Sequence, residues 1–68
     1  MMNMETTGEL VRKRRAVLGI DQRDLARISG VSIHTISDME AGKGNPTVTT
    51  LARILDAVGM ELHVQVKE

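Results

Sequence analysis

The sequence predicts a small all-α domain of four to five helices with a short β-strand at its C-terminal end. Three observations lead to this prediction. Apolar residues recur at intervals of three and four through most of the 68 residues, which is typical of helices with one buried face. Glycines and helix-capping residues divide this pattern into short segments. After Gly59 the pattern changes to alternation, which is typical of a strand.

The composition limits how the interior is built and which sites it can hold. The chain has no cysteine and no aromatic residue, so we expect a core of Leu, Ile, Val, Ala and Met, without a disulfide or a thiolate metal site. A domain of this length buries only about 60% of the surface of its unfolded chain, which favours stabilisation by self-association. No apolar run approaches the roughly 20 residues that span a bilayer, so we expect a cytoplasmic protein and no membrane partner.

The first helix is expected to begin after Thr6 or Thr7, whose hydroxyls can accept a hydrogen bond from a free backbone N–H. Its predicted inner face consists of Leu10, Val11 and Leu18. The chain as a whole then divides into a disordered N-terminus over residues 1–5, a helical domain over residues 6–59 and a strand over residues 60–68.

The second and third helices are predicted to be short and separated by a glycine. Asp21 is positioned to cap a helix over residues 22–29, which Gly30 ends after two turns. Ser32 is positioned to cap a third helix that reaches about residue 41. The residues expected to supply apolar surface are Leu25, Ala26, Ile28, Ile36 and Met39.

The longest loop signal precedes the fourth helix and consists of Gly42, Gly44, Asn45 and Pro46. Thr47 is positioned to cap a helix that runs to about residue 58. Its apolar residues repeat at three and four positions and are Val48, Leu51, Ile54, Leu55 and Val58.

Residues 60–68 have the pattern of a strand. No second strand is predicted elsewhere in the chain, and a lone strand leaves its backbone N–H and C=O groups unpaired. We therefore expect this strand to pair with its copy in a twofold homodimer. The alternative is a frayed terminal tail. The expected dimer interface consists of Met60, Leu62, Val64 and Val66.

Two short helices joined by a tight turn containing glycine form a helix-turn-helix, whose second helix enters the major groove of DNA. Residues 22–42 fit this arrangement. Within this segment the residue types that recur at constant spacing in a known family are Gln22, Leu25, Ala26, Gly30, Val31, Ser32, Thr35, Ile36, Ser37, Glu40 and Gly42. Through them the chain resembles the Cro/phage-repressor (Xre-like) family over about residues 8–59, which implies a lambda-repressor-like fold.

The resemblance implies a structural ion pair and a DNA-binding face. The pair joins Arg15 to Glu40, and a partly buried pair of this kind fixes geometry more than it adds stability. A phosphate contact is implied for Gln22, and base reading is implied for three residues of the third helix, Ile33, His34 and Asp38. The expected DNA-binding residues are Gln22, Arg23, Ser32, Ile33, His34, Thr35, Ser37, Asp38 and Lys43.

The side chains of the third helix have chemistry that suits base edges. His34 can donate to guanine or phosphate, Ile33 can pack on a thymine methyl, and Asp38 can accept from cytosine N4. Alternatively, His34 is a solvated surface residue and Ile33 packs in the core. Asp38 departs from the family, which usually has a basic or amide residue there. Two further departures are Ala41, which lacks the side-chain amide or cation that many members of the family aim at a phosphate, and Arg14, which occupies a place that is usually apolar.

Nine basic and nine acidic residues give a formal net charge of zero, so phosphate binding depends on where the charges lie. Residues 12–15 are four consecutive cations, but helical spacing spreads them around the helix, and we expect one or two to reach phosphate. Lys43 is the better candidate, because it lies between two glycines in the loop after the third helix.

An enzyme is not expected. The only two histidines, His34 and His63, lie on different elements, and no cysteine or cluster of carboxylates lies at metal-ligand spacing from them. The glycines form no phosphate-binding loop. We therefore expect no catalytic residue, no metal and no cofactor.

The expected function is that of a sequence-specific repressor that binds an inverted-repeat operator as a homodimer. The C-terminal strand is similar to that of HipB-type antitoxins, which implies repression of the protein's own operon and a HipA-like kinase toxin as partner. Two alternatives are a stand-alone Xre-type repressor and a protein-interaction module that has lost DNA binding.

Overall fold

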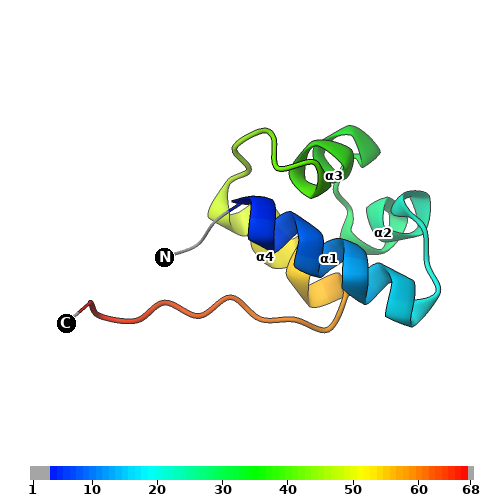
Figure 1. The fold of residues 1–68 in the computed structure, drawn as a ribbon. Coiled ribbons are helices and arrows are strands. Elements are labelled where there is room, and N and C mark those ends of the chain that lie inside the picture. The colour runs from blue at the N-terminus through cyan, green and yellow to red at the C-terminus, as the bar shows by residue number, and fades with distance from the viewer. Residues whose placement is uncertain (1–3, 68) are drawn as a thin grey trace.

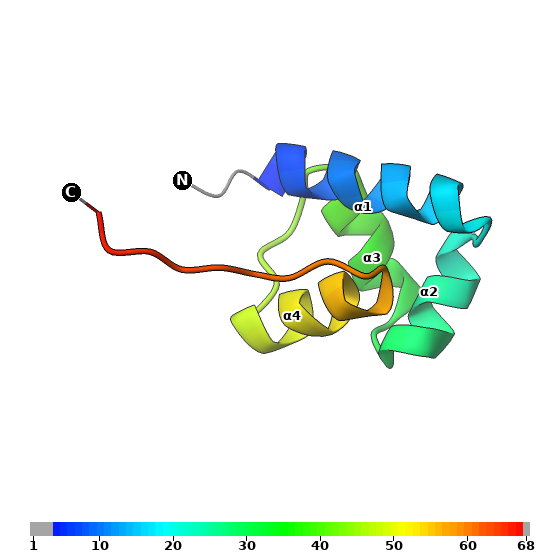
Figure 2. The same ribbon diagram turned by 90° about the horizontal axis from the view of Figure 1, so that it is seen from below.

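Four helices make up the body of the part of the chain that the structure describes. The computed structural model describes residues 4–67, which contain α1 (Met4–Leu18), α2 (Gln22–Ser29), α3 (Ile33–Glu40) and α4 (Val48–Ala57). α1 packs against α3, and α2 packs against both α3 and α4 (Figure 1). Viewed from below, α1 and α4 flank α3 (Figure 2). The prediction of an all-α helical domain is confirmed for the described residues.

The three predicted helix caps are formed. The Asp21 carboxylate accepts a hydrogen bond from the N–H of Asp24, and the Asp24 carboxylate accepts one from the N–H of Asp21. Ser32 and Thr47 each accept a hydrogen bond from the N–H three residues further on. These bonds satisfy backbone groups that the start of a helix leaves free. Local polar residues thus locate the starts of α2, α3 and α4.

The start of α1 differs from the prediction. The helix begins at Met4, ahead of Thr6 and Thr7, so residues 4 and 5 are helical and not disordered. The first N–H groups of a helix can also be satisfied by water, so a hydroxyl cap is not required there. The remaining residues of the predicted disordered segment, 1–3, lie outside the described residues.

α1 approaches α3 very closely at Gly8. Gly8 is buried within the helix, and a Cβ at this position would overlap the carbonyl oxygen of Met39 and lie 3.0 Å from the Cα of Glu40. Glycine destabilises a helix interior relative to alanine. Its presence here is explained by the close contact between the two helices.

The core is built from aliphatic side chains and methionine, as predicted. Part of the predicted apolar face is nevertheless exposed in three of the helices, namely Leu10 and Leu18 of α1, Ile28 of α2 and Val48 of α4. A domain with four short helices covers only a narrow stripe of each one, so residues at the edge of a stripe remain in water. The buried core consists of Val11, Leu25, Val31, Ile36, Met39, Leu51, Ile54, Leu55 and Val58.

The predicted strand is not formed. Residues 60–67, which we call the C-terminal tail, follow α4 as an extended segment that runs back beside α4 and then beyond the helices (Figures 1 and 2). Within residues 4–67 no other segment is extended beside it to pair with its backbone. The physical reason is that a strand requires a partner, and the single chain does not supply one.

Candidate nucleic-acid interface

The helix-turn-helix is formed by α2, α3 and the turn between them. Gly30 ends α2 in the left-handed conformation, with φ of +71°, and its N–H donates to the carbonyl of Ala26. A residue with a Cβ would be strained at this φ. The next N–H, that of Val31, donates to the Ser29 hydroxyl at 3.2 Å. The turn is therefore fixed by hydrogen bonds of two successive N–H groups, one to a backbone carbonyl and one to a serine hydroxyl nearby in the sequence.

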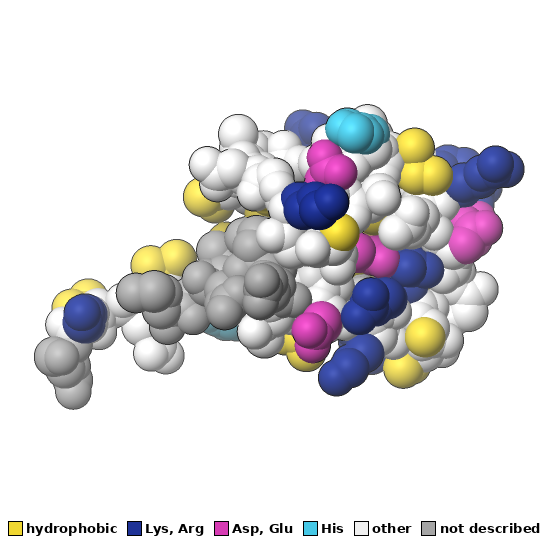
Figure 3. Space-filling view, turned by 45° about the horizontal axis from the view of Figure 1, so that its top comes forward, with side chains coloured by type: hydrophobic (Ala, Val, Ile, Leu, Met, Phe, Trp, Pro, Cys, Tyr) yellow, Lys and Arg dark blue, Asp and Glu magenta, His cyan; other side chains and the backbone are white. Residues whose placement is uncertain are grey.

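α3 has one buried and one exposed face. Ile36 and Met39 are fully buried, whereas the side chain of His34 is 86% exposed. A histidine, an acidic and a basic side chain lie close together on the outer face of α3 and the loop that follows it (Figure 3). The predicted base-reading residues Ile33 and His34 are exposed, and Asp38 is partly exposed. The predicted contact residues Ser32, Ser37 and Lys43 are exposed, and Thr35 is half-buried.

Arg15 and Glu40 join α1 to the end of α3. The guanidinium donates to both carboxylate oxygens, from Nε to Oε2 at 2.7 Å and from Nη2 to Oε1 at 2.6 Å. Its third donor, Nη1, reaches the carbonyl of Ile20 at 3.2 Å. The Arg15 and Glu40 side chains are only 15% and 3% exposed. The pair implied by the resemblance is therefore present, and it fixes the far end of α3.

Gln22 has a contact that sequence reasoning did not anticipate. Its side-chain amide donates to Oε1 of Glu40 at 3.2 Å. This bond links the start of α2 to the buried ion pair and uses one of the donors of the amide. Arg23 beside it is exposed.

The environment of Glu40 stabilises its charged form. Burial by itself would raise the pKa of the carboxyl group, but the hydrogen bonds from Arg15 and Gln22 and the positive charge of Arg15 lower this pKa below its ordinary value. The hydrogen bond with Glu40 raises the pKa of Arg15 in turn. Both groups are thus charged across the physiological pH range.

The run of four cations at residues 12–15 is divided between different roles. Arg14 donates from Nε to the carbonyl of Val58 at 3.0 Å, which satisfies a carbonyl at the end of α4. Arg15 holds Glu40, and Arg12 and Lys13 are exposed. The departure at Arg14 thus has a structural explanation, because the guanidinium links α1 to α4.

Asp38 lies on the outer face of α3, close to His34 and to the loop that contains Lys43. One oxygen, Oδ2, lies 3.3 Å from Nε2 of His34 one turn earlier. The backbone carbonyl of Asp38 accepts a hydrogen bond from the N–H of Lys43 at 2.8 Å. Asp38 and Lys43 also line the same small hollow with Thr35. The imidazole of His34 is thus the neighbour of the carboxylate, while Lys43 bonds to the backbone of the same residue.

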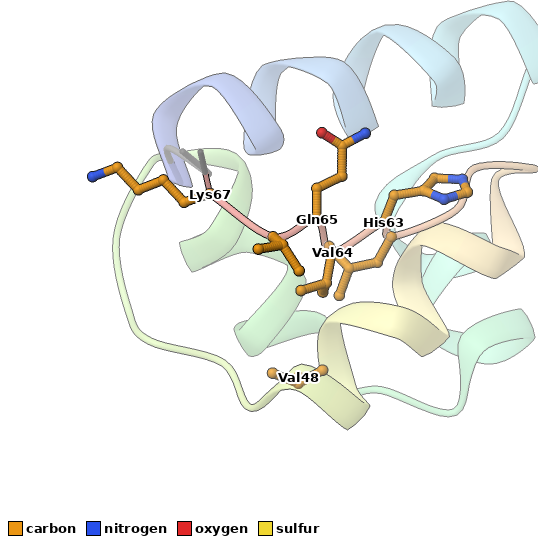
Figure 4. Close-up of a pocket in the computed structure, with 7 residues that line it drawn as sticks. Val48, His63, Val64, Gln65 and Lys67 are labelled. Atoms are coloured by element: carbon orange, nitrogen blue, oxygen red, sulfur yellow. The ribbon is translucent and has the colours of Figure 1, made fainter.

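The four residues predicted for the dimer interface divide into two pairs. Met60 and Leu62 are partly buried against the core. Val64 and Val66 are 89% and 91% exposed. The tail and Val48 line a shallow apolar hollow at the start of α4 (Figure 4). The outer half of the tail thus presents uncovered apolar surface.

Two kinds of feature are absent from the described residues. Between residues 4 and 67, no three His, Asp or Glu side chains gather as a metal site would require. No helix in that same range has the length and apolar character needed to cross a membrane.

Comparison with known proteins adds independent evidence. An HTH-type transcriptional regulator of Archaeoglobus fulgidus is 39% identical over 54 residues, which are 79% of this chain and 24% of that protein. The ImmF control region 10 kDa protein of Bacillus phage phi105 is 30% identical over 64 residues, covering 94% of this chain and 71% of the phage protein. The chain therefore spans about a quarter of the archaeal protein and most of the phage protein.

A solved structure has the same fold. The crystal structure of ClgR, the clp gene regulator of Corynebacterium glutamicum, superimposes with a TM-score of 0.78 at 31% identity, covering 90% of this chain and 65% of ClgR. Residues 11–64 match the helix-turn-helix family HTH_3. With the turn at Gly30, the exposed α3 and the pair that fixes it, this match establishes that the chain belongs to the helix-turn-helix family of transcriptional regulators.

Proposed function

We propose that the protein binds double-stranded DNA in a sequence-specific manner, with α3 in the major groove, and acts as a transcriptional repressor. The observation that carries the proposal is the outer face of α3, where His34 and its neighbours are exposed. The end of the same helix is held by the ion pair of Glu40 with Arg15 of α1. A rigid helix with free polar side chains at its start suits the reading of base edges. The relatives' description as transcriptional regulators supports the same role.

Phosphate contacts are proposed for exposed residues on both sides of α3. Arg23 lies at the start of α2, and Lys43 lies in the loop after α3. The formal net charge is zero, so binding depends on these local cations and not on the field of the whole molecule. Gln22 remains a candidate through the donor that Glu40 does not use.

We further propose that the C-terminal tail joins two copies of the chain as an antiparallel ribbon. Its backbone has no strand partner within residues 4–67, and Val64 and Val66 are almost fully exposed. Pairing with a second tail would satisfy the backbone and cover these valines together with Val48. A twofold dimer of this family places its reading helices about 34–36 Å apart on an inverted repeat.

A more specific role is that of an autoregulatory antitoxin of the HipB type, with a HipA-like kinase as protein partner. The feature that favours it is a helix-turn-helix domain followed directly by a short extended tail with alternating apolar residues. Co-purification of the chain with the product of a neighbouring kinase gene would support this role. A stand-alone repressor would bind its operator without such a partner.

The experiment that tests DNA binding measures fluorescence anisotropy of DNA from upstream of the protein's own gene at two salt concentrations. We expect tight binding that weakens steeply as salt rises, because bound cations release counterions. His34→Ala should weaken binding roughly tenfold, as expected for one base contact. Arg53→Ala is the matched surface control, because Arg53 is exposed on α4.

The result that would contradict the proposal is the absence of binding at low salt by a folded protein. That outcome would favour a protein-interaction module. If His34→Ala and Arg53→Ala lose the same affinity for DNA, the proposal that α3 reads the bases is contradicted.

A further inference from the structure

The exposed face of α3 carries a donor and an acceptor side by side. His34 and Asp38 are one helical turn apart, and Nε2 of the imidazole lies 3.3 Å from Oδ2 of the carboxylate. Neither side chain is needed by the core, since their exposed fractions are 86% and 41%. The packing of the core therefore does not account for a carboxylate at this position of the proposed DNA-binding face.

The position of Asp38 is well defined. Its backbone carbonyl accepts from the N–H of Lys43, and α3 ends two residues later at Glu40, which is held by Arg15. Lys43 lines the same small hollow as Asp38. The backbone at Asp38 is therefore held on both sides, by the bond from Lys43 and by the ion pair at Glu40.

The chemistry of the major groove restricts what this carboxylate can read. An ionised carboxylate only accepts hydrogen bonds. The bases offer it two donors in this groove, N4 of cytosine and N6 of adenine. Beside N6, however, adenine places the acceptor N7, which repels a second acceptor. Cytosine has no such acceptor on that side, and its partner guanine presents two acceptors, O6 and N7, to the neighbouring donor.

We propose that His34 and Asp38 form one reading unit that selects a C·G base pair. Asp38 accepts a hydrogen bond from cytosine N4. The imidazole of His34 donates from its ring N–H to an acceptor of the paired guanine. This inference rests on the proposed DNA binding and identifies the base pair that the unusual residue of α3 selects.

The test is a selection of binding sequences from a library of randomised DNA duplexes with the full chain. The wild-type protein is expected to select a C·G pair at one position of each half-site. Asp38→Asn is expected to select an A·T pair at that position, because an amide donates to N7 while accepting from N6. We expect the ratio of the affinities for the C·G duplex and the A·T duplex to change by about tenfold or more between the two proteins, as for one specific base contact.

Two further variants complete the design. The His34→Ala protein should still select a base pair at the same position of the half-site. Its preference for C·G over other base pairs should be weaker, since the guanine contact is lost. Asp56→Asn makes the same chemical change on an exposed part of α4 and should select the wild-type sequence. Circular dichroism of each variant confirms that it is folded.

The outcomes separate this inference from the proposed function. If the wild-type protein enriches a sequence and Asp38→Asn enriches the same one, the reading unit is overturned while DNA binding stands. The same conclusion follows if His34→Ala leaves discrimination unchanged. If the folded wild-type protein enriches no sequence, sequence-specific binding itself is overturned, and the reading unit with it.

Discussion

The backbone groups of two regions differ in whether they find hydrogen-bond partners. These regions are the α2–α3 unit, residues 21–42, and the C-terminal tail, residues 60–67. In the α2–α3 unit, Asp21, Ser32 and Gly30 satisfy the helix ends locally, and Arg15 and Glu40 fix the unit to α1. The tail has an equally regular sequence pattern but no strand partner within the described residues. A helix obtains most of its backbone partners within its own segment, whereas a strand needs a second extended segment, and residues 4–67 contain none beside the tail.

The largest loss of stability is expected from removal of the ion pair that links the α2–α3 unit to α1. Arg15→Ala should lower the free energy of unfolding by about 3–5 kcal/mol, because it leaves a buried carboxylate without its cation. Urea denaturation monitored by circular dichroism measures the change. Arg53→Ala, at an exposed position of α4, should change stability by less than about 0.5 kcal/mol.

Replacing both partners of the ion pair provides a second test. Arg15→Met combined with Glu40→Leu should recover much of the loss, since two apolar side chains need no mutual charge compensation. A single variant Arg15→Ala that is as stable as the wild-type protein would show that the pair does not hold α3 in place.

The next effect concerns the contact between α1 and α3. Gly8→Ala should destabilise the fold by roughly 1–3 kcal/mol, as overpacking of a tight contact does, because the new Cβ would overlap the carbonyl of Met39. Thermal unfolding measures it. Thr6→Ala, at an exposed position of the same helix, is the control. A stabilised Gly8→Ala protein would contradict the close packing described for this site.

Acid should weaken the α2–α3 unit. The pKa of Glu40 is lowered in the folded protein, by hydrogen bonds from Arg15 and Gln22 that outweigh burial, and the pKa of Asp21 is lowered by hydrogen bonding to the N–H of Asp24. A lowered folded-state pKa contributes stability above the unfolded-state value, about 4 for carboxyl groups. This contribution is lost as pH falls through the folded-state value.

The urea midpoint should therefore decrease between about pH 5 and pH 2. Glu40→Gln should be less stable at neutral pH but should lose less stability on acidification. If the two proteins lose stability in parallel over this range, Glu40 is not a source of the acid sensitivity.

The smallest expected effect on stability comes from the tail. Val64→Thr combined with Val66→Thr should change the stability of the dilute chain by less than about 0.5 kcal/mol, because both side chains are already exposed. The same variant should weaken self-association, measured by sedimentation velocity over a concentration series. Unchanged association would contradict the ribbon dimer. A large loss of stability in the dilute chain would show instead that the outer tail packs within one copy.

The parts of the fold that local chemistry decides were predictable from the sequence. The caps at Asp21, Ser32 and Thr47 were identified because each makes its hydrogen bond within three residues. The start of α1 was placed too late, because no polar side chain is required where water meets the first N–H groups. The interior composition followed from the residue types alone.

The candidate site was predictable only in part. The exposed positions of α3 follow from the buried spacing of Ile36 and Met39. The pair of Arg15 and Glu40 came from family resemblance, since no local signal joins residues that far apart. The contacts of Gln22 with Glu40 and of Arg14 with Val58 were missed, because their side chains cross between elements.

The starts of α2, α3 and α4 and the glycine turn after α2 follow from the sequence alone, since a cap or a glycine turn acts over three or four residues. The tertiary structure decided which edge of each apolar stripe is buried and which polar side chains meet. Arg14 reaches Val58 across 44 positions and Arg15 reaches Glu40 across 25. Such contacts depend on how the helices pack around one small core, and that arrangement is a property of all four helices together.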